Sequence, residues 1–320
     1  MTLLEGHHSP DCAPADERFD GRLTDPALLR IDYLAPPPDV APYVTTFFLM
    51  RCDEREIRDV QPAMGGTLGI FLRGGQGDVR FLDGRVEPSH RFVLLTPASA
   101  AAAIAFEGPW HAFGAALSPL GWAALTGLSA AEHANHLYDA ERVLGEDFAQ
   151  AAERICAGYA AGTLAPAEMV PILSAAILAH VRPLPAKHLE LLRSVAQWLG
   201  ASLSPALAGL EALSGYSARQ TQRLVDHYYG LPPKGLARKY RAIRAASLLA
   251  DPRLSADDAA AIADHFYDQS HMIREIRMFV GRTPARVGVP GQPYLSAIID
   301  LRNFREVSPR IAPLPADLRA

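Results

Sequence analysis

The sequence of 320 residues contains only three cysteines, and they are widely spaced. Cys12, Cys52 and Cys156 include no Cys-x-x-Cys pair, which argues against a zinc ribbon or a disulfide scaffold and suits a reducing cytoplasm. No apolar stretch reaches the roughly eighteen residues of a membrane-spanning helix. The pattern of a signal peptide, a basic start followed by an apolar run, is missing too. These absences predict a cytoplasmic protein with no membrane segment.

Catalytic and metal-binding motifs are missing as well. The chain has no Gly-x-Ser-x-Gly elbow, no P-loop and no dinucleotide-binding fingerprint. His90 and His111 stand alone, and no His-x-His pair is present to begin a metal site. His133 and His136 are expected on the solvated face of a helix. The sequence therefore predicts neither enzymatic activity nor a cofactor or bound metal.

Charged residues are unevenly distributed, although the net charge of the chain is only −4. Residues 186–287 contain 14 Lys and Arg against 9 Asp and Glu, a net charge of +5, whereas the rest contains 17 against 26, a net charge of −9. A basic segment attracts the phosphate backbone, and this attraction dominates the affinity of proteins for nucleic acid. The distribution favours a DNA-binding C-terminal domain attached to an acidic N-terminal domain.

An amphipathic helix is predicted after Ser217, which is a suitable N-cap. Its core-facing stripe has the i, i+3, i+4, i+7 spacing of one helix face and comprises Thr221, Leu224, Val225 and Tyr228. Its opposite face carries Arg219, Gln222, Arg223 and Asp226. Arg and Gln can make bidentate contacts to guanine and adenine. The alternative interpretation is an ordinary amphipathic helix with a solvated polar face.

A second amphipathic helix is predicted about fifty residues later, with Asp268 as its N-cap. Its apolar stripe comprises Met272, Ile273, Ile276, Phe279 and Val280, and its polar side carries Ser270, His271, Arg274 and Arg277. Gln269 projects towards the apolar side and could read a base only from the first turn. Two such helices on one rigid body can enter neighbouring major grooves, roughly 34 Å apart. Sequence-specific binding to double-stranded DNA is therefore the leading hypothesis.

Further motifs surround these helices in a fixed order. They are Leu210–Ser217 with Gly215, then Arg219, Gln222 and Arg223, Gly230–Lys234, Arg241, Arg244–Leu249, Ala263, Phe266–His271 and Gly281–Pro284. In this order and spacing, residues 189–287 resemble the DNA-binding domain of the AraC/XylS family of transcription regulators. The resemblance implies two helix-turn-helix units joined by a central helix over about Pro233 to Ala250.

The same resemblance implies which side chains read bases: Arg219, Gln222, Arg223, Gln269, Ser270, His271 and Arg274. We assign phosphate contacts to a helix start and to nearby basic side chains, namely Ser217, Lys234, Arg238, Arg241, Arg277 and Arg282; the alternative for each basic residue is a solvated surface charge. Met272 and Ile276 replace aromatic residues that the family usually has. This departure predicts looser packing in the second unit.

The N-terminal half has short apolar runs separated by turn signals such as Gly74-Gly75 and Asp83-Gly84. The expected strands are Val44–Met50, Thr67–Leu72, Asp78–Leu82, Arg91–Leu95 and His111–Leu117. Their spacing predicts a compact antiparallel sheet or small barrel. Helices are expected over residues 119–160 and 166–181, before a Pro183-Leu-Pro185 break. The opening Tyr33–Pro38 and Pro42–Val44 resemble a subgroup of the cupin-like sensory domains found in AraC-type regulators.

The predicted fold class is α+β in two domains. A cupin-like β-barrel with following helices spans residues 31–182, and an all-α domain with two helix-turn-helix units spans residues 186–288. Residues 1–30 are expected to form a disordered leader, and residues 289–320 a tail whose apolar stretch Tyr294–Leu301 packs back on the body.

Two hypotheses describe the N-terminal domain. In the first, aromatic side chains line a pocket for a small-molecule effector: Phe71, Phe81, Phe92, Trp110 and Phe113. In the second, the domain only forms a homodimer or meets a protein partner, through contacts such as Leu125, Leu128, Ala131 and Leu137. The first requires an effector with different affinities for two arrangements of the protein.

Overall fold

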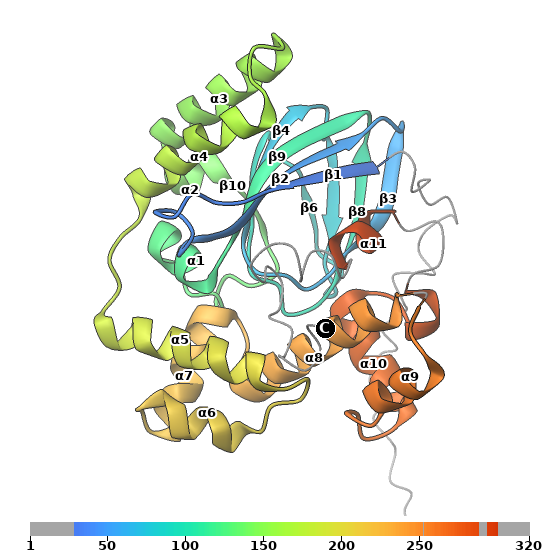
Figure 1. Cartoon of the computed structure of the whole chain (residues 1–320). Helices are drawn as coiled ribbons and strands as arrows, with labels where there is room; N and C mark the ends of the chain where they lie inside the picture. The colour runs from blue at the N-terminus through green and yellow to red at the C-terminus, as the bar shows by residue number, and fades with distance from the viewer. Residues whose placement is uncertain (1–28, 252, 288–292, 300–320) are drawn as a thin grey trace, which may run out of the picture.

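The computed structural model describes residues 29–251, 253–287 and 293–299, and it confirms an α+β fold with two parts. A β-barrel with flanking helices forms the N-terminal domain, and a group of helices beneath it forms the C-terminal domain (Figure 1). The predicted leader lies outside the described residues except for Leu29 and Arg30, which begin the first strand. No helix in the described ranges has both the length and the apolar character to span a membrane.

The barrel consists of two antiparallel sheets. The six-stranded sheet has the order β1 (Leu29–Leu34), β2 (Val44–Cys52), β9 (Trp110–Leu117), β4 (Thr67–Arg73), β7 (Phe92–Leu95) and β10 (Leu137–Asp139). The four-stranded sheet has the order β3 (Glu56–Gln61), β8 (Ala102–Glu107), β5 (Gly77–Arg80) and β6 (Val86–Pro88). The central strands β2, β4 and β9 are buried on both faces, because one face lines the barrel interior and the other is covered by helices.

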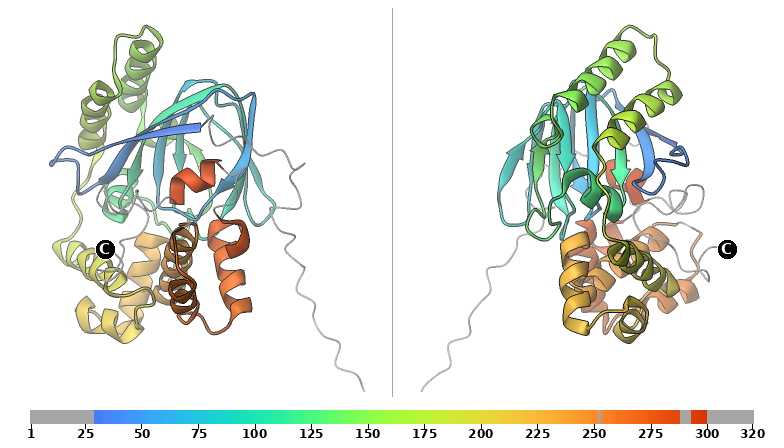
Figure 2. Two further views of the ribbon diagram at one scale, coloured as in Figure 1. Left: turned by 45° about the vertical axis from the view of Figure 1, so that its right-hand side comes forward. Right: turned by 90° about the vertical axis from the view of Figure 1, so that its left-hand side faces the viewer.

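Four helices cover the outer face of the larger sheet (Figure 2, right). They are α1 (Pro119–Thr126), α2 (Ala140–Leu144), α3 (Glu146–Ala160) and α4 (Pro166–His180). Trp122 of α1 and Phe148 of α3 pack against Phe47, Leu68 and Phe113 of the sheet in one buried cluster. This outer core covers only the larger sheet. The second sheet and the barrel mouth are therefore left for contact with the C-terminal domain.

The C-terminal domain begins with α5 (Ala186–Ala201). The first helix-turn-helix unit consists of α6 (Leu207–Ser214) and α7 (Ala218–Tyr229), and the second of α9 (Ala256–Ala263) and α10 (Gln269–Val280). The central helix α8 (Pro233–Leu249) joins the two units, as the resemblance implied. A 3-10 turn (Pro284–Arg286) and α11 (Pro293–Ile299) follow.

The two units are packed differently. The first has a core of its own with α5, which includes Trp198, Leu224, Val225 and Tyr228. The second shares one continuous core with the barrel interior, α8 and α11. Met272 and Ile276 are buried in this shared core. The smaller side chains in place of family aromatics are thus buried, and the looser packing of the second unit stays a prediction.

The five strands expected from the sequence are all present, with ends shifted by at most a few residues. Strands β1, β3, β6, β8 and β10 were not predicted. Two of them have an unfavourable composition, because β3 is rich in charge and β8 is rich in alanine, which favours strands weakly. His133 and His136 precede β10 in a turn and not on a helix, and His136 Nδ1 lies 2.7 Å from Glu87 Oε1.

Candidate nucleic-acid interface

The first recognition helix, α7, begins and ends as its sequence dictates. Ser217 is extended (φ −64°, ψ 153°), and its hydroxyl accepts a hydrogen bond from the Gln220 N–H at 3.4 Å. Gly230 ends the helix in the left-handed region at φ +78°. Thr221 on the buried face donates to the Ser214 hydroxyl at 2.9 Å, which ties α7 to α6. These contacts orient the opposite face of α7 towards solvent.

That opposite face forms a shallow hollow on the surface. It is lined by Ser217, Arg219, Gln220, Gln222, Arg223 and Asp226. Arg219, Gln222 and Arg223, the three residues assigned to base reading, are all exposed. Partial burial raises the pKa of the Asp226 carboxyl above its ordinary value. Guanidinium and amide groups that point outward from one helix face are the side chains best suited to read base edges in the major groove.

The second recognition helix, α10, is capped by Asp268, whose Oδ1 accepts from the His271 N–H at 2.7 Å. Gln269, Ser270 and Arg274 are exposed at its first turns. His271 is half-buried, and its Nε2 lies 3.4 Å from Glu275 Oε1. The structure therefore brings three of the four assigned residues to the surface together and places the fourth, His271, beside Glu275 of the same helix.

Glu275 is the centre of an ion-pair cluster between α10 and α8. Its side chain is 1% exposed, and its two carboxylate oxygens accept from Arg238 Nε at 2.5 Å and from Arg241 Nη2 at 2.6 Å. Arg241 also donates to Ser204 Oγ at 3.1 Å. Arg238 and Arg241, both assigned to phosphate, are thus engaged in joining the second unit to the central helix. The Arg238 side chain is still 40% exposed and can face a phosphate from its outer edge.

The other assigned phosphate contacts divide into exposed and enclosed positions. Ser217 and Lys234 are exposed, and Arg277 is half-buried. Arg282 is enclosed between α10 and the barrel, with its side chain 1% exposed and its Nη2 3.9 Å from Asp59 Oδ1. In this arrangement Arg282 cannot reach a phosphate, because the N-terminal domain covers the turn that follows α10.

Sequence reasoning missed a lysine that joins the two domains. Lys239 of α8 is 3% exposed, and its Nζ donates to the carbonyls of Ala98 at 2.6 Å and Met64 at 3.2 Å. Burial lowers the pKa of its amine to about 7. Its position could have been found from periodicity, because it lies on the apolar stripe of α8 between Leu236 and Ile243.

Both recognition helices end against the N-terminal domain. The Ala130 N–H donates to the His227 carbonyl in the last turn of α7 at 2.7 Å. The Ala63 and Ala101 N–H groups donate to the Phe279 and Met278 carbonyls of α10 at 2.7 and 2.9 Å. The last carbonyls of a helix have no partner within the helix. Backbone amides of the N-terminal domain therefore complete both recognition helices and hold them in place.

Gly281 lies at the closest approach between α10 and the barrel. Its φ is +81°, and a Cβ there would lie 2.2 Å from Val60 Cγ1 and 3.2 Å from Ala101 Cβ. We expect Gly281→Ala to lower the free energy of unfolding by about 1–2 kcal/mol because alanine is strained in the left-handed region. The clash of its Cβ with Val60 should add a further loss. Urea denaturation measures the total loss of stability. Gly215→Ala is the matched control, since Gly215 has φ +66° and no atom within 4 Å. Equal losses at the two positions would contradict the tight contact.

A cavity of about 110 Å³ lies within the barrel and is lined mainly by apolar side chains. Trp110 is the one of the five assigned pocket aromatics that lines it. Phe71 and Phe81 are buried in the shared core, and Phe92 and Phe113 point into the outer core, where Phe113 stacks on Phe47 at 6.1 Å between ring centroids. Side chains alternate along a strand, so Ala112 and not Phe113 faces the cavity. Phe48, Phe106, Tyr33 and Tyr294 supply the other rings.

Comparison with protein families matches residues 210–288 to a helix-turn-helix domain, the segment that contains α7, α8 and α10. The C-terminal domain is an AraC-type helix-turn-helix domain. The matched segment of this AraC-type domain starts within α6 and ends before α11, so α5 and α11 lie outside it.

Among solved structures, two similar chains are both ToxT from Vibrio cholerae. ToxT from strain O395 is 8% identical and covers 84% of this chain and 98% of its own, with a TM-score of 0.43. A second crystal form of ToxT is 8% identical and covers 84% and 97%, with a TM-score of 0.44. A comparison with curated protein sequences finds no match. The AraC-type domain makes this chain a DNA-binding regulator.

Proposed function

We propose that this regulator binds specific DNA sequences by inserting α7 and α10 into neighbouring major grooves. The observation that carries the proposal is the exposed polar hollow of α7, in which Arg219, Gln222 and Arg223 lie together and neither arginine has an ion-pair partner among the described residues. Two arginines and one glutamine on one face can contact guanine and adenine over successive base pairs.

The second helix contributes Gln269, Ser270 and Arg274 to base reading, while His271 contacts Glu275 and so positions the first turn of α10. Ser217, Lys234 and Arg277 remain the proposed phosphate contacts, together with the exposed edge of Arg238. A phosphate contact fixes orientation without sequence preference, whereas a base contact gives preference at one position. This difference makes the two sets separable by experiment.

Arg223→Ala is expected to weaken binding to the preferred sequence by about 1–3 kcal/mol and to relax the preference at one base pair. The measurement is a mobility shift at fixed salt, first on DNA upstream of the protein's own gene and then on a library of single-base variants. Arg142→Ala is the control, since Arg142 lies on α2 of the N-terminal domain and is 86% exposed. A uniform loss across all sequences would instead assign Arg223 to a phosphate.

For the N-terminal domain, we propose that the barrel cavity receives a small, largely apolar effector. The alternative, a purely dimerising or protein-binding module, is less well supported, because two of its candidate contacts, Leu125 and Leu137, are buried within the chain itself. A thermal-shift screen with small apolar compounds, followed by mobility shifts with any compound that stabilises the protein, tests the proposal. If no compound raises the unfolding temperature and DNA binding depends only on protein concentration, the dimerisation alternative is favoured.

A further inference from the structure

The helix α11 lies across the mouth of the barrel (Figure 1; Figure 2, left). It follows the matched AraC-type segment in sequence and packs on β1, β3 and α8. Tyr294, Leu295, Ile298 and Ile299 are all buried. The expected return of the C-terminal apolar stretch to the body is therefore confirmed for Tyr294–Ile299.

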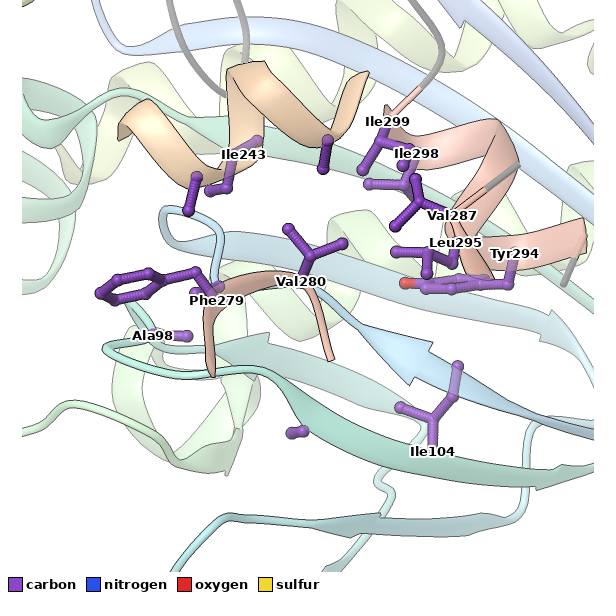
Figure 3. Close-up of a cluster of buried hydrophobic side chains, with 14 of the residues drawn as sticks. Ala98, Ile104, Ile243, Phe279, Val280, Val287, Tyr294, Leu295, Ile298 and Ile299 are labelled. Atoms are coloured by element: carbon purple, nitrogen blue, oxygen red, sulfur yellow. The ribbon is translucent and has the colours of Figure 1, made fainter. Parts of the chain in front are cut away.

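The two sides of α11 face different parts of the molecule. Tyr294 and Ile298, four residues apart, line the barrel cavity. Leu295 and Ile299 do not line it, although all four side chains belong to the shared core. Figure 3 shows this side of α11 gathered with Val280, Val287 and Ile243 of the C-terminal domain. The same short helix thus forms a wall of the cavity and part of the packing of the second unit.

Asp59 connects α11 to the second unit through polar contacts. Its side chain is fully buried, and Oδ2 accepts from the Tyr294 N–H at 3.0 Å and the Leu295 N–H at 3.2 Å. Its Oδ1 lies 3.9 Å from Arg282 Nη2, directly after α10. The Tyr294 hydroxyl donates to Gln61 Oε1 on the same strand as Asp59. Removal of α11 from the mouth therefore takes two hydrogen bonds from the carboxylate that holds Arg282.

The cavity is smaller than most ligands. At about 110 Å³ it is below the roughly 150 Å³ of an apolar cavity known to admit benzene. A ligand with more than one ring can enter only where a wall gives way. The strands of the barrel are fixed by their ladders and by the outer core, whereas α11 is a helix of only seven residues, held by side-chain packing and a few polar contacts. Tyr294 and Ile298 are accordingly the side chains that such a ligand would replace.

The chemistry of the lining limits the ligand. Within the residues that the structure describes, no charged side chain lines the cavity. Trp110 is 2% exposed, and its Nε1–H has no hydrogen-bond partner among the described residues. A buried donor without a partner costs free energy that an acceptor on a ligand would recover. The lining therefore fits an uncharged, apolar molecule that carries one hydrogen-bond acceptor.

We propose that α11 is a built-in competitor for the effector cavity: an uncharged ligand of two or more rings with one acceptor displaces Tyr294 and Ile298, and the departure of α11 loosens the second helix-turn-helix unit from the barrel. This inference rests on the proposed effector site. A competitor within the chain lowers the apparent affinity in proportion to the fraction of molecules in which the cavity is open. Weaker docking of α11 must therefore tighten ligand binding.

The test uses the full chain and two nearly isosteric probes, 2-acetylnaphthalene and 2-ethylnaphthalene, with binding followed by probe fluorescence. We expect saturable binding, tighter for the ketone, and a loss of this difference in Trp110→Phe. Leu295→Ala removes an anchor of α11 that does not line the cavity, so it should tighten binding at least about tenfold. Leu173→Ala is the matched control, because Leu173 is equally buried in the outer core on α4.

Amide hydrogen exchange separates the two proposals. With probe bound, we expect faster exchange at Tyr294 and Leu295, whose amides donate to Asp59, and at Ala63 and Ala101, whose amides donate to α10. Probe binding with unchanged or slower exchange at these four amides would overturn the competitor and leave the effector site standing. Failure of both probes to bind either the wild type or Leu295→Ala would overturn the effector site itself. Probe binding to Leu295→Ala but not to the wild type supports the competitor, because α11 then occupies the cavity wall too tightly in the wild type for the probe to displace it.

Discussion

Glu275→Ala is expected to lower the free energy of unfolding by about 3 kcal/mol and to separate α10 from α8. The carboxylate is buried and accepts from Arg238 at 2.5 Å and from Arg241 at 2.6 Å, so its loss leaves two guanidinium groups without this counter-charge. Breaking a buried pair by removing one partner costs roughly 3–5 kcal/mol. We place the effect at the lower end, because the Arg238 side chain is 40% exposed and water can screen it.

Urea denaturation measures the loss, and mobility shifts on an operator measure its effect on DNA binding. Glu211→Ala is the control, since Glu211 is exposed on α6 and should change the stability by less than about 0.5 kcal/mol. Glu275→Gln keeps the shape and hydrogen-bonding oxygen and should lose less than the alanine variant. If Glu275→Ala were as stable as the control, the cluster would not hold the second unit to the central helix.

The second large effect concerns Lys239 and pH. Burial lowers the pKa of its amine in the folded protein to about 7, from its ordinary value of 10.5. Between these two values the unfolded chain binds more protons than the folded one, so stability rises with pH over this window and is lost as pH falls towards 7. The slope from this group is at most about 1.4 kcal/mol per pH unit. Lys239→Met, which fills a similar volume without a charge, should remove it.

Urea unfolding at pH 7, 8 and 9 tests this expectation as the difference between wild type and variant. Lys234→Met is the matched control on the same helix, because Lys234 is exposed and its loss should leave the slope unchanged. The raised pKa of about 6 at Asp59 acts below this range, and the raised values of Tyr229 and Tyr240 act above it. An identical pH dependence in wild type and Lys239→Met would show that Lys239 is solvated in the folded protein.

The recognition helices were predictable because every signal that defines them is local. Ser217 and Asp268 cap the N-termini, Gly230 and Gly281 end the helices at positive φ, and the apolar stripe between them has helical spacing. Such signals act within about four residues of each other and need no tertiary context. The exposed face of α7 follows directly from the same periodicity.

The contacts between the domains were not predictable, because they join segments far apart in sequence. Arg282 lies within a family motif and was expected to contact phosphate, yet it is buried beside Asp59, more than two hundred residues earlier. Asp59 also adds to the polar character of β3, which is why the sequence did not predict a buried strand there. Its burial makes sense only once α11 supplies two N–H donors. Trp110 lines the cavity as the sequence predicts, but the strand register that turns Phe113 away is a property of the whole sheet.

The amides of Ala63, Ala101 and Ala130 fix the distance between the two recognition helices. Because they terminate α10 and α7 on the same N-terminal domain, the separation and relative twist of the two helices are set by a part of the protein outside both helix-turn-helix units. Moving one half-site by a single base pair rotates it by about a tenth of a helical turn. While the N-terminal domain holds the ends of both helices, such an operator should be rejected. Once the second helix is released, the same protein should accept half-sites with more varied spacing.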